Sequence, residues 1–201
     1  MTSHLQPRSI GLVAALLLCV AFANTASAKP AGPSGNASFP EVKDSWSPDA
    51  RFVLKNVDST EDPKKPPTIF LTDMKTGERT QLHSYARKAD VLWSPSSDAV
   101  AINDWDADDE AQCIVFRLVP TQQRYDLREE FLKSRRPERE KKLAADRRDY
   151  DYNFAHLIRW LNGNTLLFVV EGHSSDGKHL FHLEYAYRLG DSFQLRSRIV
   201  R

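Results

Sequence analysis

The sequence is poor in cysteine and has no marked excess of charge of either sign. It contains only two cysteines, and its 28 basic residues nearly balance its 27 acidic residues. A neutral protein has no long-range field that attracts phosphates, so this composition argues against nucleic acid as a partner. Cys113 lies in the apolar run 113–116, which predicts a buried hydrophobic residue rather than a reactive thiol.

Long apolar runs are also scarce, and the main one lies near the N-terminus. Residues 10–23 carry no charge, Arg8 precedes them, and Ala26-Ser27-Ala28 follows. This order is the pattern of a secretory signal peptide, so we expect residues 1–28 to be removed by cleavage after Ala28. The mature protein would then be periplasmic or secreted, with no transmembrane segment. An uncleaved anchor is the alternative, although the run is shorter than the roughly 20 residues that span a bilayer.

Cleavage at this site has two consequences. It removes Cys19, so Cys113 is the only cysteine left and no intrachain disulfide can form. It also removes one basic residue and no acid, which leaves 27 residues of each sign. The stability of the mature chain must therefore come from its apolar core.

A catalytic constellation is missing as well. The Gly-x-Ser-x-Gly turn of serine hydrolases does not occur, and its nearest match, Gly172-His173-Ser174-Ser175-Asp176, lacks the final glycine. We therefore expect a protein that is not an enzyme and that needs no organic cofactor.

What the sequence does contain is an internal repeat. Trp46-Ser47-Pro48-Asp49 recurs as Trp93-Ser94-Pro95-Ser96, and each copy precedes a short apolar run, a polar loop and a second apolar run. A third copy begins at Trp160, where Leu161-Asn162 replaces Ser-Pro. Proline favours a turn, the following polar side chain can bond backbone amides, and tryptophan can pack between neighbouring sheets.

These corners resemble the blade repeats of TolB-like and WD-like β-propellers, which also occur in the propeller domains of prolyl oligopeptidase-like proteins. The resemblance implies an all-β fold of three blade-like antiparallel sheets, a partial or compact propeller, in one domain over residues 44–201. Three units are fewer than the four to eight blades of an ordinary propeller. The open sheet edges would need cover from an insertion, from the leader or from a second chain, which makes a homodimer one solution.

Local sequence patterns predict the elements of this domain. Residues 29–43 are rich in small and turn-forming residues and are expected to be a flexible leader. Residues 122–149 are highly charged and are expected to be a helical insertion that Pro137 interrupts. Short β-branched or aromatic runs separated by turn residues predict strands at 52–56, 68–73, 79–83, 90–93, 99–103, 112–118, 157–160, 165–171, 179–189 and 192–200.

An acidic loop over residues 104–110 is the first candidate binding site. Its alternate acids Asp104, Asp106, Asp108 and Glu110 could supply oxygen ligands to calcium. Asp109, however, stands where calcium loops usually need glycine, so a solvated hairpin tip is the competing interpretation.

A second candidate lies at the hairpin over residues 171–182. It holds five residues that can bind a transition metal, namely Glu171, His173, Asp176, His179 and His182. His179 and His182 are three positions apart and point to opposite faces of a strand, which excludes their simple pairing.

The leading functional hypothesis is a protein-interaction module that binds another envelope or secreted protein. The expected surface is the loop face that bears the acidic loop and the charged insertion. The alternative is a protein that binds a ligand or a divalent metal through the 104–110 loop or the 171–182 hairpin.

Overall fold

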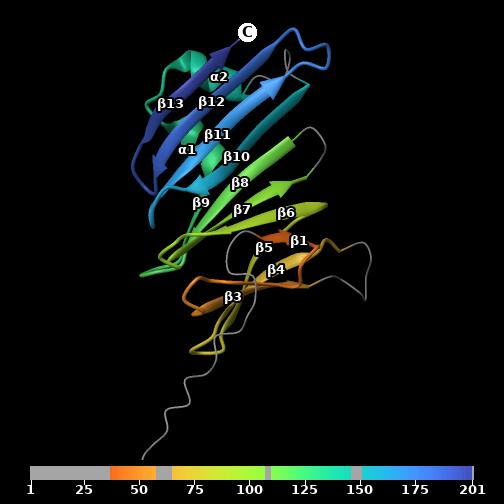
Figure 1. Cartoon of the computed structure of the whole chain (residues 1–201), viewed down its shortest axis with the longest axis vertical. Coiled ribbons are helices and arrows are strands. Elements are labelled where there is room, and N and C mark those ends of the chain that lie inside the picture. Colours follow the sequence, from red (N-terminus) through yellow and green to blue (C-terminus); the bar gives the residue numbers. More distant parts are fainter. Residues whose placement is uncertain (1–36, 58–64, 107–109, 146–150, 201) are drawn as a thin grey trace, which may run out of the picture.

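The computed structural model describes residues 37–57, 65–106, 110–145 and 151–200, and within them the chain is predominantly β-sheet (Figure 1). The strands are β1 (Ala37–Phe39), β2 (Asp44–Trp46), β3 (Phe52–Val57), β4 (Thr68–Asp73), β5 (Arg79–Ser84), β6 (Lys88–Trp93), β7 (Ala99–Trp105), β8 (Glu110–Arg117), β9 (Gln123–Asp126), β10 (Tyr152–Trp160), β11 (Thr165–His173), β12 (Leu180–Arg188) and β13 (Phe193–Val200). The helices are α1 (Leu127–Lys133) and α2 (Glu138–Ala145). The all-β prediction is confirmed, and each of the ten predicted strands overlaps an observed one. The predicted signal peptide lies outside the described residues.

Three antiparallel meanders make up the fold, as the repeat predicts. β2 to β5 form a separate four-stranded sheet, β6 to β9 form the second meander, and β10 to β13 form the third. The second and third meanders are joined because β8 and β10 run parallel at their starts, where Glu110 faces Asn153 and Ala111 faces Phe154. The result is one four-stranded sheet and one nine-stranded sheet.

Two boundaries differ from the sequence expectation. The leader was expected to be flexible as far as residue 43, whereas residues 37–39 form β1 and pair antiparallel with β6. Phe39 drives this pairing because its side chain is fully buried against the first and second meanders. The insertion was expected to be helical from residue 122, whereas Gln123–Asp126 forms β9, which completes the second meander.

Each repeat corner is a turn closed by a side-chain oxygen that accepts from a backbone amide further along the chain. The Ser47 hydroxyl accepts from the Phe52 amide at 3.0 Å, and the Ser94 hydroxyl accepts from the Ala99 amide at 3.1 Å. In the third copy the Asn162 side-chain oxygen takes this role and accepts from the Thr165 amide at 2.9 Å. The degenerate Leu-Asn corner therefore keeps the physical function of Ser-Pro.

The corner tryptophans link each unit to the one before it. The Trp93 indole N–H donates to the Ser45 hydroxyl at 3.0 Å, and the Trp160 indole N–H donates to the Leu92 carbonyl at 2.9 Å. Ser45 and Leu92 both immediately precede the corner tryptophan of their own unit, so the two contacts reach equivalent positions, through a side-chain hydroxyl in one case and a backbone carbonyl in the other. This regularity is the strongest structural support for three repeated units.

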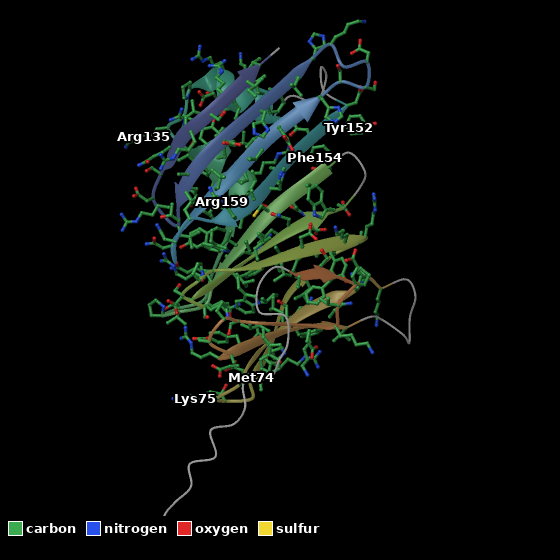
Figure 2. The ribbon with its side chains drawn as sticks, in the orientation of Figure 1. Met74, Lys75, Arg135, Tyr152, Phe154 and Arg159 are labelled. Carbon is green, nitrogen blue, oxygen red and sulfur yellow. The ribbon has the colours of Figure 1, made fainter. Side chains whose placement is uncertain are left out.

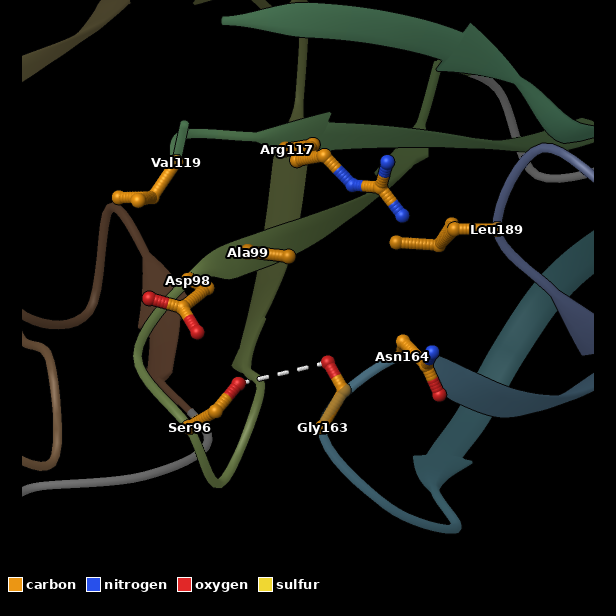
Figure 3. A pocket seen from close by; sticks show the side chains of 8 residues that line it. All are labelled: Ser96, Asp98, Ala99, Arg117, Val119, Gly163, Asn164 and Leu189. Atoms are coloured by element: carbon orange, nitrogen blue, oxygen red, sulfur yellow. Dashed lines mark hydrogen bonds between the residues drawn. The ribbon is translucent and has the colours of Figure 1, made fainter. Parts of the chain in front are cut away.

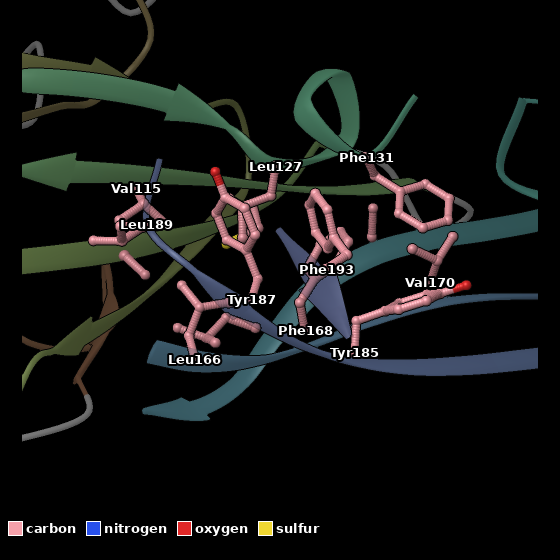
Figure 4. Packing of buried hydrophobic residues seen from close by; sticks show 14 of the residues in the cluster. Val115, Leu127, Phe131, Leu166, Phe168, Val170, Tyr185, Tyr187, Leu189 and Phe193 are labelled. Carbon is pink, nitrogen blue, oxygen red and sulfur yellow. The ribbon is translucent and has the colours of Figure 1, made fainter. Parts of the chain in front are cut away.

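Two hydrophobic clusters hold the sheets together. The first lies between the first and second meanders and includes Phe39, Leu54, Trp93 and Ile102. The second joins the opposite face of the second meander, the third meander and helix α1 (Figure 4). Strand β7 alternates between them, because Val100 and Ile102 belong to the first cluster whereas Ala99 and Ala101 belong to the second.

Helix α1 packs on the face of the third meander rather than along an edge. The Asp126 side chain caps the helix by accepting from the amides of Arg128 and Glu129. One turn apart, Leu127 and Phe131 are fully buried, and the Phe131 ring lies 4.9 Å from that of Tyr185. The insertion therefore contributes to the core.

Candidate binding cleft

A cleft of about 370 Å³ lies where the third meander meets the second. Its walls come from strands β1, β6, β7 and β10. The lining residues are Ala37, Ser38, Lys88, Asp90, Leu92, Asn103, Trp105, His156, Leu157 and Ile158. The cleft thus combines an indole, an imidazole and an aliphatic wall with two charged side chains, and Ile158 is 41% exposed there.

Asn103 fixes β10 at the floor of the cleft. Its side-chain amide donates to the Leu157 carbonyl and accepts from the Leu157 amide, each at 2.8 Å. Asn103 is 4% exposed, so these two bonds form in a largely dry environment. The pairing of β10 with β11 shifts in register between Leu157 and Arg159. The Asn103 side chain forms its two hydrogen bonds with the backbone of Leu157, at the start of this shift.

A polar network orients the indole of Trp105. Its N–H donates to Asp90 Oδ2 at 2.7 Å, while the Ser38 hydroxyl donates to Oδ1 of the same carboxylate. Lys88 Nζ lies 3.3 Å from Asp90 Oδ1. Because Asp90 has partners on both oxygens, it acts as a positioning group for Trp105, whose side chain stays partly exposed in the cleft.

Aromatic side chains continue from the cleft along β10. The Trp105 ring lies 5.5 Å from that of His156 and 6.0 Å from that of Phe154. The Tyr152 ring stacks on His173 at 4.4 Å. Figure 2 shows Tyr152 and Phe154 near one end of β10 and Arg159 nearer its other end.

Two histidines and two glutamates form a cluster beside this aromatic row. His182 lies between Glu171 and Glu184, with Nδ1 2.7 Å from Glu171 Oε2 and Nε2 3.1 Å from Glu184 Oε1. His156 Nε2 lies 3.9 Å from Glu171 Oε1. The strands pair Glu171 with His182 and place His156 on the neighbouring strand, so the cluster follows directly from the sheet register.

The two histidines have opposite pKa shifts. Burial lowers the pKa of His156, and the attraction of Glu171 offsets this only in part. For His182, burial also lowers the pKa, but hydrogen bonds and attraction from Glu171 and Glu184 outweigh it and the pKa is raised. Near neutral pH His182 is therefore the more readily protonated of the two, and the His156 ring favours the neutral form.

The predicted hairpin site is brought together only in part. Glu171 and His182 are in contact, but His173 stacks on Tyr152, and Asp176 accepts from Ser174 and pairs with Lys178. The carboxylates of the cluster flank the His182 ring on its two nitrogens instead of surrounding a common centre. Among the residues that the structure describes, no three histidine, cysteine, aspartate or glutamate side chains form a group that could hold a metal ion.

The predicted acidic loop is also dispersed where it can be followed. Asp104 is 3% exposed and is hydrogen-bonded to His83 of the first meander, whereas Glu110 pairs with Arg128 at 3.2 Å. Asp106 is exposed at the end of β7. Asp108 lies outside the described residues, so calcium binding through the full set of four acids stays a prediction.

No pattern in the sequence predicts the cleft. Its key side chains, Asp90, Trp105 and His156, are far apart in the chain and match no local motif. The available signal was the buried asparagine in a strand pattern: Asn103 interrupts an apolar run, and a buried amide requires hydrogen-bond partners across the sheet. Cys113, by contrast, was predicted correctly, since it is fully buried and burial raises its thiol pKa.

No family model and no curated protein matches this sequence. One similar solved structure is a protein from Agrobacterium tumefaciens that is provisionally named TolB, with 14% sequence identity and a TM-score of 0.31. The similarity covers 79% of this chain and 65% of that protein. The all-β assignment therefore rests on the sheets themselves.

Neither helix in the described part of the chain has the length and apolar character needed to cross a bilayer.

Proposed function

We propose that the protein is a non-enzymatic interaction module of the periplasm or of the secreted fraction, and that it binds an extended segment of another protein in the cleft between its second and third meanders. The signal-peptide pattern supports the location. The observation that carries the proposal is a cleft lined by the partly exposed Trp105 and the exposed Ile158 together with the charged Lys88 and Asp90.

The chemistry of the cleft suits a protein ligand. Protein interfaces obtain most of their binding energy from a few anchors that fill pockets, and aromatic and aliphatic side chains are typical anchors. A volume of about 370 Å³ accommodates one or two such side chains. Lys88 and Asp90 place charges of both signs in the lining, where they favour the correct partner and register.

Selection from a random displayed peptide library tests the proposal, followed by affinity measurements on the enriched peptides. Ile158→Asp should weaken binding at least about tenfold, because it places a charge on the apolar wall. Met74→Asp is the matched control, since Met74 is 48% exposed at the far end of the molecule from the third meander (Figure 2). Failure to enrich any peptide, or equal affinity for both variants, would contradict the proposal.

A further inference from the structure

A second pocket, of about 320 Å³, lies at the corner end of the second and third meanders (Figure 3). It is built from the turn after β6, the end of β8, and the turns before β11 and after β12. The lining residues are Ser96, Asp98, Ala99, Arg117, Val119, Gly163, Asn164 and Leu189.

The two corner turns that frame this pocket are in direct contact. The Ser96 hydroxyl donates to the Gly163 carbonyl at 3.4 Å, and a Cβ at position 163 would meet Ser96 Oγ at 2.8 Å. Only glycine allows this approach without displacing the Ser96 side chain. The Leu189 amide donates to the Asn164 carbonyl at 3.0 Å, which holds the third turn in place. The pocket is therefore preformed by the fold.

Arg117 is the uncompensated charge of the pocket. Within the described residues its guanidinium has no hydrogen bond or ion pair, and Figure 3 shows it extended toward Leu189. The acid of the pocket, Asp98, is already bound by Arg51 of the first meander at 2.8 Å. Ala99, Val119 and Leu189 supply apolar surface to the pocket, and Figure 3 shows Leu189 beside the guanidinium.

We propose that this pocket binds a carboxylate that carries a short aliphatic group. Arg117 pairs with the carboxylate through two parallel N–H donors, the geometry that guanidinium offers and ammonium does not. The aliphatic group rests on Leu189, which lies beside the guanidinium. The Ser96 hydroxyl and the Asn164 side-chain amide also line the pocket and can bond a neighbouring amide of the ligand.

Two sources share this chemistry, a free acyl amino acid and the C-terminal carboxylate of a polypeptide. Amide NMR titration with N-acetylleucine and with a short peptide that ends in leucine distinguishes them. N-acetylleucinamide, which lacks the charge, is the matched neutral probe. Binding of the small acid alone indicates a free metabolite, whereas binding of both indicates that the pocket also admits a chain terminus.

The expected result is a saturable shift of the Ser96, Gly163 and Leu189 amides with at least one of the two acids, and at least about tenfold weaker binding of the neutral probe. Arg117→Met should cause a similar loss, because it keeps the aliphatic stem and removes the charge. Arg159→Met, an exposed arginine on β10, should leave the affinity unchanged. No shift with either acid, or equal binding by the Arg117 variant in a spectrum that shows intact folding, would overturn the proposal.

Discussion

Replacing Asn103 by alanine tests how the third meander is attached to the second. The change removes both hydrogen bonds to the Leu157 backbone, each 2.8 Å long and shielded from solvent. An orphaned buried donor or acceptor costs about 1–3 kcal/mol. The substitution leaves two such groups, the amide and the carbonyl of Leu157. Water that enters from the cleft can bond these groups and recover part of the lost free energy. We expect the free energy of unfolding to fall by about 3 kcal/mol.

Urea denaturation followed by tryptophan fluorescence measures this loss. Asn162→Ala is the matched control, since the Asn162 side chain also bonds backbone amides but lies in an exposed turn where water can replace it. Its cost should stay below about 1 kcal/mol. If Asn103→Ala costs no more than Asn162→Ala, the two meanders are not held together at this point and the reasoning is refuted.

Four further predictions concern packing, charge and metal binding. Gly172→Ala should destabilise the fold by at least about 2 kcal/mol in the same assay, because a Cβ there would lie 2.5 Å from the Phe181 ring. Phe131→Ala should cost about 3–5 kcal/mol and lower the melting temperature, since this fully buried ring anchors the insertion. The raised pKa of His182 means that its stabilising effect is complete below pH 6.5 and is lost as the pH rises through the folded-state pKa, so His182→Gln should flatten the decline in stability above pH 6.5. Millimolar calcium should leave the melting temperature unchanged, because Asp104 is already bound to His83; a clear rise would restore the acidic loop as a metal site.

The parts of this structure that depend on local contacts can be predicted from the sequence. Turn residues and β-branched runs predict the strands, and the Trp-Ser-Pro corners predict three meanders, because both depend on contacts between near neighbours in the chain. The strand β1 was missed because its pairing with β6 depends on the burial of Phe39 by residues far along the sequence. The strand at Gln123–Asp126 was missed because it has only four residues and the highly charged residues that follow it favour a helix.

The candidate sites depend on how the strands and meanders are placed in space rather than on any local sequence motif. The contact between Glu171 and His182 follows from hairpin register, so a predicted hairpin already places them together. The position of His156 beside Trp105 requires the third meander to dock on the second, and no local pattern encodes that docking. Arg117 likewise gains its role only when three turns meet around it.

The third unit docks on the second through its corner tryptophan, and this docking creates the cleft. Nuclear Overhauser contacts of the Trp160 indole proton test it most directly. We expect cross-peaks from this proton to the backbone of Leu92 and Trp93, because the indole nitrogen lies 2.9 Å from the Leu92 carbonyl oxygen. An indole proton that exchanges rapidly with water and shows contacts only within residues 152–200 would mean that the third unit does not dock on the second at this point.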